Sequence, residues 1–149
     1  MTTREALQKA AKFCAYQERS QAEVRRKLLS WGMERETAES IIAELTSQGF
    51  LSEQRYANAF VSGKYHLKSW GREKIIRTLQ VQGISERCIR EALQSVDFSD
   101  YESCIRKVAE KWERSHAQLP ENERRWKLRA YLFSRGFEPD EIQKVVEEM

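Results

Sequence analysis

Arginine and lysine gather in three short stretches of the sequence, each of them just before a glycine. Their charged groups bind phosphate or carboxylate oxygens through ion pairs and hydrogen bonds. Because the pattern recurs, we predict that the chemistry of this chain is recognition of a charged partner. The candidate binding residues are Arg25, Arg26 and Lys27, then Arg72, Lys74 and Arg77, and finally Arg124, Arg125, Lys127 and Arg129.

Residues that catalyse reactions or hold metals do not form a recognisable set in this sequence. His66 and His116 are isolated, without an acid or a cysteine at ligand spacing. The three cysteines show no Cys-x-x-Cys spacing and lie among apolar residues, which is typical of buried, reduced thiols. No glycine-rich phosphate loop, HExxH sequence or nucleophile elbow is present. We therefore predict a protein that is not an enzyme and has no metal or cofactor.

The elements that must position the basic residues emerge when the chain is aligned on Gly32, Gly83 and Gly136, which are 51 and 53 residues apart. In all three copies apolar residues stand four and eight positions before the glycine and one, six, nine, ten and thirteen positions after it. Such spacings are typical of helices rather than strands. Glycine suits the position after a helix end, where φ is positive. Each copy therefore predicts a helix, a tight turn and a second helix.

A further helix is predicted upstream of each copy, which makes three helices per unit. The predicted fold is all-α: an elongated or curved array of three tandem three-helix repeats, about nine helices in total, over residues 1–50, 51–97 and 98–149. Helix-start signals agree with this division: capping boxes at Ser20–Glu23 and Ser99–Glu102, an N-cap at Ser85 and a first-turn proline at Pro139. A unit of about 50 residues buries little surface alone, so we expect the units to pack together at their joints.

The distribution of charge favours phosphate or a charged protein over base reading. The net charge is only +3, but residues 51–97 hold the largest excess of cations. The basic residues precede the turn, whereas a DNA-reading helix–turn–helix places its contacts after it. Ordinary solvated helix faces are the alternative interpretation. Trp70 and Trp126 stand beside basic residues, and either partner contact or packing between units would explain them.

The chain lacks the signals of a membrane or secreted protein. No apolar run approaches the roughly 18 residues of a membrane span, and the N-terminal residues are charged where a signal peptide is apolar. We expect a cytoplasmic monomer without a membrane partner.

Three stretches of the sequence resemble the bacterial regulatory protein family RecX. They are RSQAEVRRKL at residues 19–28, GFLSEQRYA at residues 49–57, and WGREKIIRTLQVQGI at residues 70–84. The third is the most specific, although Arg72 stands where the family commonly has proline, Thr78 where it often has glutamate and Gln82 where it often has a basic residue. The third unit matches mainly by pattern, through Lys127, Leu132 and residues 135–137.

This resemblance implies a function that the composition does not. It implies a negative regulator of the recombinase RecA that binds in the groove of the RecA–single-stranded DNA filament and inhibits ATP hydrolysis, strand exchange and the SOS response. The ten basic residues would then face the filament or its DNA, and we expect Arg72, Lys74 and Arg77 to be replaceable without loss of the fold. A protein that binds DNA directly through the basic residues is the main alternative, and a helical scaffold for an unrelated protein is another.

Overall fold

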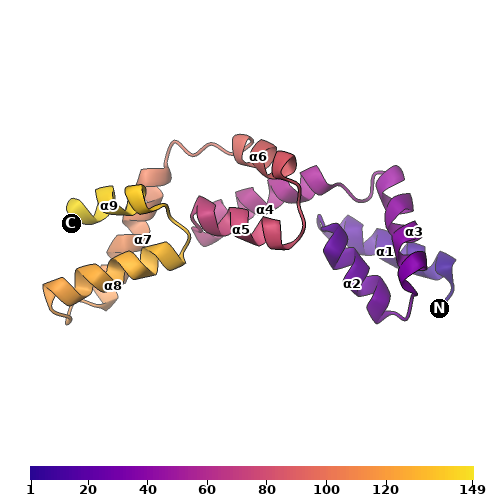
Figure 1. The fold of residues 1–149 in the computed structure, drawn as a ribbon, viewed down its shortest axis with the longest axis horizontal. Helices are drawn as coiled ribbons and strands as arrows, with labels where there is room; N and C mark the ends of the chain where they lie inside the picture. Colours follow the sequence, from indigo (N-terminus) through magenta and orange to yellow (C-terminus); the bar gives the residue numbers. More distant parts are fainter.

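The computed structural model describes residues 1–149 as nine helices without a strand, which confirms the predicted fold class. Figure 1 shows an elongated array with the two termini at opposite ends. No helix has the length and apolar character that crossing a membrane requires. Unit one contains α1 (Thr3–Tyr16), α2 (Gln21–Ser30) and α3 (Arg35–Ser47); unit two contains α4 (Glu53–Lys68), α5 (Arg72–Val81) and α6 (Glu86–Gln94); unit three contains α7 (Tyr101–Ser115), α8 (Glu121–Ser134) and α9 (Pro139–Glu147).

The repeated glycines end the middle helix of each unit, as predicted. Gly32, Gly83 and Gly136 have φ angles of 89°, 80° and 96°, in the region that favours glycine. The residue after each glycine donates its N–H back to the leucine carbonyl four positions before the glycine, at 3.1, 3.1 and 3.2 Å. This hydrogen bond closes the helix end and sends the chain into the third helix of the unit.

Most of the predicted helix starts are confirmed, and one is wrong. Ser20 and Glu23 form the reciprocal capping box of α2, and Ser85 accepts a hydrogen bond from the N–H of Cys88. The capping box predicted at Ser99 does not form, because α7 begins later and has no side-chain cap. The carboxylate of Asp97 instead accepts the N–H of Ser99 at 2.9 Å, so this turn is organised from the residues before it.

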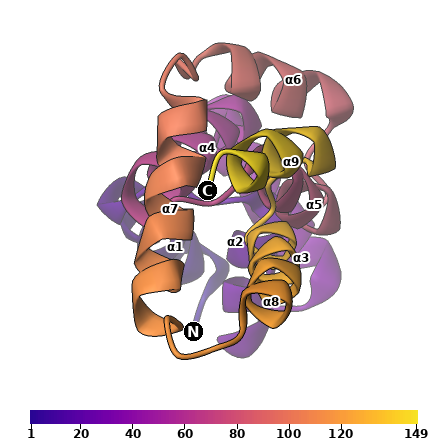
Figure 2. The same cartoon turned by 90° about the vertical axis from the view of Figure 1, so that its left-hand side faces the viewer.

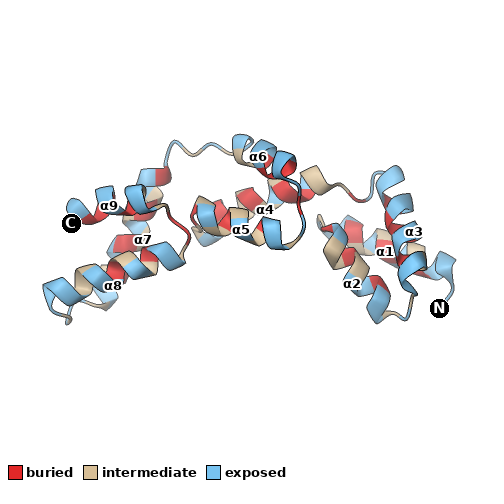
Figure 3. Cartoon of the chain, in the orientation of Figure 1, coloured by how far each residue is buried: buried red, intermediate tan, exposed pale blue.

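Buried side chains form two cores rather than three. Figure 3 shows that buried residues occur in all three units. Unit one has its own core, which also takes in Leu51 from the start of the second predicted unit. Units two and three share a single continuous core. Tyr65 of α4, Tyr101 of α7 and Phe137 meet at their boundary, where ring centroids lie 5.8 and 5.9 Å apart. The two C-terminal units are therefore one packed body.

Backbone groups of units two and three interlock at Gly71 and Gly136. The N–H of Gly71 donates to the carbonyl of Arg135 at 2.8 Å, and the N–H of Glu73 donates to the carbonyl of Gly136 at 2.9 Å. A Cβ atom on either glycine would overlap the other segment. The start of α5 has no side-chain cap from its own unit. Unit three thus supplies the acceptors that the first turn of a helix requires.

A half-buried polar triad reinforces this junction. The hydroxyl of Tyr101 accepts the N–H of Arg72 at 3.0 Å and donates to the carboxylate of Glu138. Arg72 Nε pairs with Glu138 Oε2 at 2.8 Å, and its guanidinium lies 4.0 Å from the centroid of the Tyr101 ring. Burial, followed by the hydrogen bond to Glu138, raises the pKa of Tyr101 well above its ordinary value. Arg72 therefore belongs to the structure of the junction, and its expected replacement without loss of the fold is not supported.

The junction between units one and two is made of fewer and more exposed ties. Arg55 Nε pairs with Glu18 Oε1 at 3.0 Å, and its terminal nitrogen donates to the carbonyl of Gly49 at 2.7 Å. The Arg55 and Glu18 side chains are 49% and 31% exposed, so water screens their attraction. Unit one is consequently joined to the rest by Leu51, by these exposed contacts of Arg55 and by the chain itself.

Replacing Gly136 by alanine should be more harmful than replacing Gly83. Both substitutions force alanine into a left-handed conformation, which costs about 1–2 kcal/mol. At Gly136 the new methyl group would also meet Lys74, whereas at Gly83 nothing lies within 4 Å. We expect Gly136→Ala to lower the free energy of unfolding by about 1–3 kcal/mol more than Gly83→Ala. Urea denaturation followed by circular dichroism measures this difference, and equal losses would show that the interlock is not tight.

Tyr101→Phe should change how stability depends on pH in alkaline solution. Above pH 10, the ordinary value for tyrosine, the unfolded chain loses the Tyr101 proton while the folded protein keeps it. The free energy of unfolding therefore falls as pH rises, by up to about 1.4 kcal/mol per pH unit for this group. The phenylalanine variant, less stable at pH 8, should show a shallower fall in urea titrations between pH 10 and 12. A slope equal to that of the wild type would contradict this assignment.

Candidate functional site

The three basic middle helices follow one another along one side of the array. Figure 1 shows α8, α5 and α2 along its lower side, and the end-on view of Figure 2 separates α8 from α7 on the opposite side of unit three. The end of α8 is hydrogen-bonded to the start of α5 through Gly71. At the other end of α5, the side chain of Gln82 accepts a hydrogen bond from the hydroxyl of Tyr56 on α4 at 2.6 Å. Glu23 of α2 lies near the same hydroxyl. We name this row of helices α8, α5 and α2 the basic row.

Half of the ten predicted binding residues form ion pairs with carboxylates of this chain. A paired cation attracts an outside anion less, because the carboxylate offsets its charge. The five ion pairs are Arg25–Glu39, Arg72–Glu138, Arg124–Glu113, Arg125–Glu121 and Lys127–Glu123. Two of these residues also have structural roles: Arg72 in the junction, and Arg124, which donates to the carbonyls of Ala117 and Leu119 in the loop before α8.

The other five have no carboxylate within ion-pair distance, and all lie on the basic row. They are Arg26, Lys27, Lys74, Arg77 and Arg129. Arg26, Lys27 and Arg77 are exposed, and Lys74 and Arg129 are half-buried. No carboxylate of this chain offsets their charge, so the structure divides one predicted set into compensated and uncompensated residues.

Uncompensated charge is most concentrated around Trp70, at the junction of units two and three. Lys74 Nζ lies 4.2 Å and Lys64 Nζ lies 4.8 Å from the centroid of the Trp70 ring. Burial lowers the pKa of Lys74, and Arg135, Arg77 and Lys64 lower it further. We define Lys64, Trp70, Lys74, Arg77 and Arg135 as the Trp70 cluster.

No carboxylate forms an ion pair with any of the four cations of the Trp70 cluster. Carbonyl oxygens partly satisfy two of them, since Arg135 donates to the carbonyl of Ser69 at 3.2 Å and Arg77 approaches that of Glu73 at 3.5 Å. The ring of Trp70 attracts the two lysines through its negative face. Gathering four like charges is unfavourable without an anion. The cluster is therefore suited to bind phosphate groups.

Sequence reasoning missed Lys64 and Arg135. Lys64 lies on the first helix of its unit, outside the recurring basic stretch, and Arg135 belongs to the next unit, directly before the glycine turn. For Trp70 the sequence left contact with a partner and packing between units as alternatives. In the structure the ring packs on Phe60 of the same unit and lies close to Lys64 and Lys74, and contact with a partner stays a prediction. The signal in the sequence that could have revealed this cluster is Trp70, which lies beside the basic stretch of α5.

Exposed apolar side chains accompany the uncompensated cations. Trp126 and Phe133 on α8 are 68% and 58% exposed, with Arg129 between them at helical spacing. On α5, Val81 is 88% exposed and borders a shallow hollow of about 510 Å³ shared with Lys74 and Arg77. Aromatic faces interleaved with cations suit single-stranded nucleic acid, whose unpaired bases stack while its phosphates pair with the cations.

Family comparisons agree with the three-unit division. Models of the first, second and third three-helix domains of RecX match residues 6–45, 52–93 and 100–146. A crystal structure of a regulatory protein RecX superimposes with a TM-score of 0.87 over 99% of this chain and 72% of that one, at 23% identity. At that identity the likeness shows the fold.

Curated relatives show the same likeness in sequence. The regulatory protein RecX of Pelodictyon phaeoclathratiforme is 31% identical over 92% of this chain and 84% of its own length. That of Leuconostoc citreum is 28% identical over 97% of this chain, but this chain spans only 54% of it. With three domain models in order and relatives over nearly its whole length, the chain belongs to the RecX family.

Proposed function

We propose that the chain is a negative regulator of RecA that binds along the RecA–single-stranded DNA filament. Bound there, it would inhibit ATP hydrolysis, strand exchange and the SOS response, acting in the cytoplasm as a monomer and by binding rather than catalysis. Membership of the RecX family supports regulation of RecA. The observation that carries the proposal is the Trp70 cluster, where four uncompensated cations meet at the centre of the basic row.

The shape of the array supports binding to a polymer. The helices α8, α5 and α2 contain 14, 10 and 10 residues, so laid end to end they span roughly 50 Å at 1.5 Å per residue. A surface of that length meets several repeats of a filament at once. Weak contacts in successive units then strengthen binding through effective concentration. The uncompensated cations in all three units would supply such contacts.

Direct binding of single-stranded DNA is the second candidate, and the exposure of Trp126 and Phe133 favours it. A protein that uses stacking and phosphate contacts alone would bind naked oligonucleotides tightly at physiological salt. A filament regulator would bind them weakly and gain affinity from the protein subunits. Titration of a labelled oligo-dT with and without the recombinase separates the two.

Replacing Lys74 and Arg77 together by alanine should weaken inhibition of the recombinase without unfolding the protein. Neither side chain has a carboxylate partner, and two charge-assisted contacts of about 1 kcal/mol each correspond to roughly a 30-fold higher half-inhibitory concentration. The assay is DNA-dependent ATP hydrolysis by the cognate recombinase. The matched control is Arg87→Ala with Arg90→Ala on α6, which removes the same charge from exposed positions outside the basic row. Equal inhibition by both variants would remove the Trp70 cluster from the mechanism.

Replacing Trp126 and Phe133 by alanine should weaken binding to naked oligo-dT by about 1–3 kcal/mol for each stacked base that is lost. The slope of affinity against salt should stay unchanged, because no cation is removed. Tyr16→Ala is the control, since this ring is 83% exposed on α1, outside the basic row. If the tryptophan and phenylalanine variant bound like the control, the stacking role would be wrong.

A further inference from the structure

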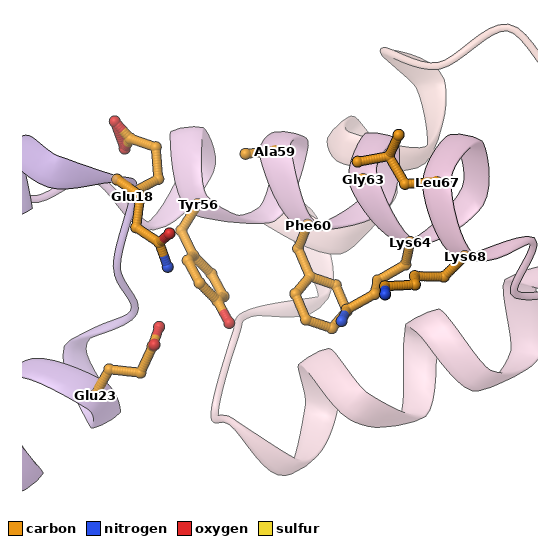
Figure 4. A pocket seen from close by; sticks show the side chains of 10 residues that line it. Glu18, Glu23, Tyr56, Ala59, Phe60, Gly63, Lys64, Leu67 and Lys68 are labelled. Carbon is orange, nitrogen blue, oxygen red and sulfur yellow. The ribbon is translucent and has the colours of Figure 1, made fainter.

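A groove runs along α4 on the side where unit one meets unit two. It encloses about 460 Å³, and Figure 4 shows its lining. Glu18 and Glu23 stand at its unit-one end, and Lys68 stands at the other. The surface between them is largely apolar and belongs to α4. The groove is thus separate from the exposed aromatic residues of α8, although Lys64 borders both the groove and the Trp70 cluster.

Two small residues and one exposed leucine line the floor of the groove. Ala59 and Gly63 are one helical turn apart on α4, and Leu67 follows at the next turn with 82% of its surface exposed. A Cβ on Gly63 would meet nothing within 4 Å. Glycine inside a helix costs about 1 kcal/mol relative to alanine. No neighbour in this chain requires that glycine, and its small size leaves room for a partner to approach α4 closely.

The charges of the groove differ from those of the basic row. Glu18 pairs with Arg55, and Glu23 accepts the N–H of Ser20 at 2.9 Å, so the unit-one end is acidic but held in place. Lys68, at the other end, has no carboxylate partner. A phosphate polymer would be repelled at the acidic end. A protein segment with one basic and one acidic end would be attracted at both.

We propose that this groove receives an amphipathic α-helix from a subunit of the recombinase. The helix would be apolar in the middle, with a basic side chain toward Glu23 and an acidic one toward Lys68. The 12 residue steps between Tyr56 and Lys68 correspond to about 18 Å, the length of a helix of roughly 12 residues. A helix suits the site because this chain offers no strand edge for an extended peptide, and small residues allow close helix packing.

This inference rests on the proposed function and deepens it, because it assigns the two faces of the array. The basic row would face nucleic acid, and the groove would face protein. Changes in the groove should therefore affect binding to the filament while leaving binding to naked DNA untouched.

Gly63→Leu tests the proposal by filling the floor of the groove. The variant should bind the recombinase filament about tenfold more weakly or worse, yet bind naked oligo-dT with the wild-type affinity and salt slope. Fluorescence anisotropy of the labelled oligonucleotide, with and without recombinase, gives both values. Ala43→Leu is the matched control, because it adds a leucine at an exposed position of α3, away from the groove. Circular dichroism shows that each variant is folded.

The outcomes separate the two proposals. If the wild type binds the filament and Gly63→Leu binds it equally well, the groove proposal is overturned and the proposed function stands. If the wild type itself ignores the filament, both fall. If sedimentation shows that the substitution disrupts only pairing between copies of this chain, a second copy is the occupant and the proposal is wrong. Should Gly63→Leu misfold, Ala59→Leu, at an exposed position of the same groove, decides by the same comparison without changing the charge.

Discussion

The alignment of the basic helices depends on a helix start that is capped by the neighbouring unit. The first N–H groups of α5 find their acceptors in the carbonyls of Arg135 and Gly136 and in the hydroxyl of Tyr101. Because these hydrogen bonds require close backbone contact, Gly71 and Gly136 hold the two units in one relative position. The end of α8 thereby meets the start of α5, and the Trp70 cluster forms where they join.

The same junction explains why similar arginines have different roles. Arg72 is held between a carboxylate and two aromatic rings, so its charge is used inside the protein. Lys74, two residues later, lies on nearly the opposite side of the helix and contacts an indole ring and other cations instead of an acid. Attraction of an outside anion therefore depends on what each cation already contacts, and the local density of arginine and lysine does not reveal it.

Local sequence signals predicted the architecture well, but they did not predict contacts between residues far apart in the sequence. The glycine at each turn and the leucine before it carry enough information in one helical turn to predict nine helices in three units. The ion pair between Arg72 and Glu138 joins residues 66 positions apart, and no periodicity indicates it. Lys64 and Arg135 joined the candidate site only through tertiary contact with Trp70 or Lys74. The failed capping box at Ser99 has a local origin instead, because the carboxylate of Asp97, two residues earlier, accepts the Ser99 N–H.

The two separate cores have a consequence for how such a molecule would leave a long partner. Units two and three share their apolar interior, whereas unit one has its own core and is joined to them through exposed contacts. If the array binds a polymer as proposed, units two and three would attach or detach together. Release would then begin at unit one while units two and three stay bound. On a polymer whose subunits exchange one at a time, unit one would dissociate and rebind while the other two units hold the protein in place. The protein would then not dissociate from the polymer in a single event.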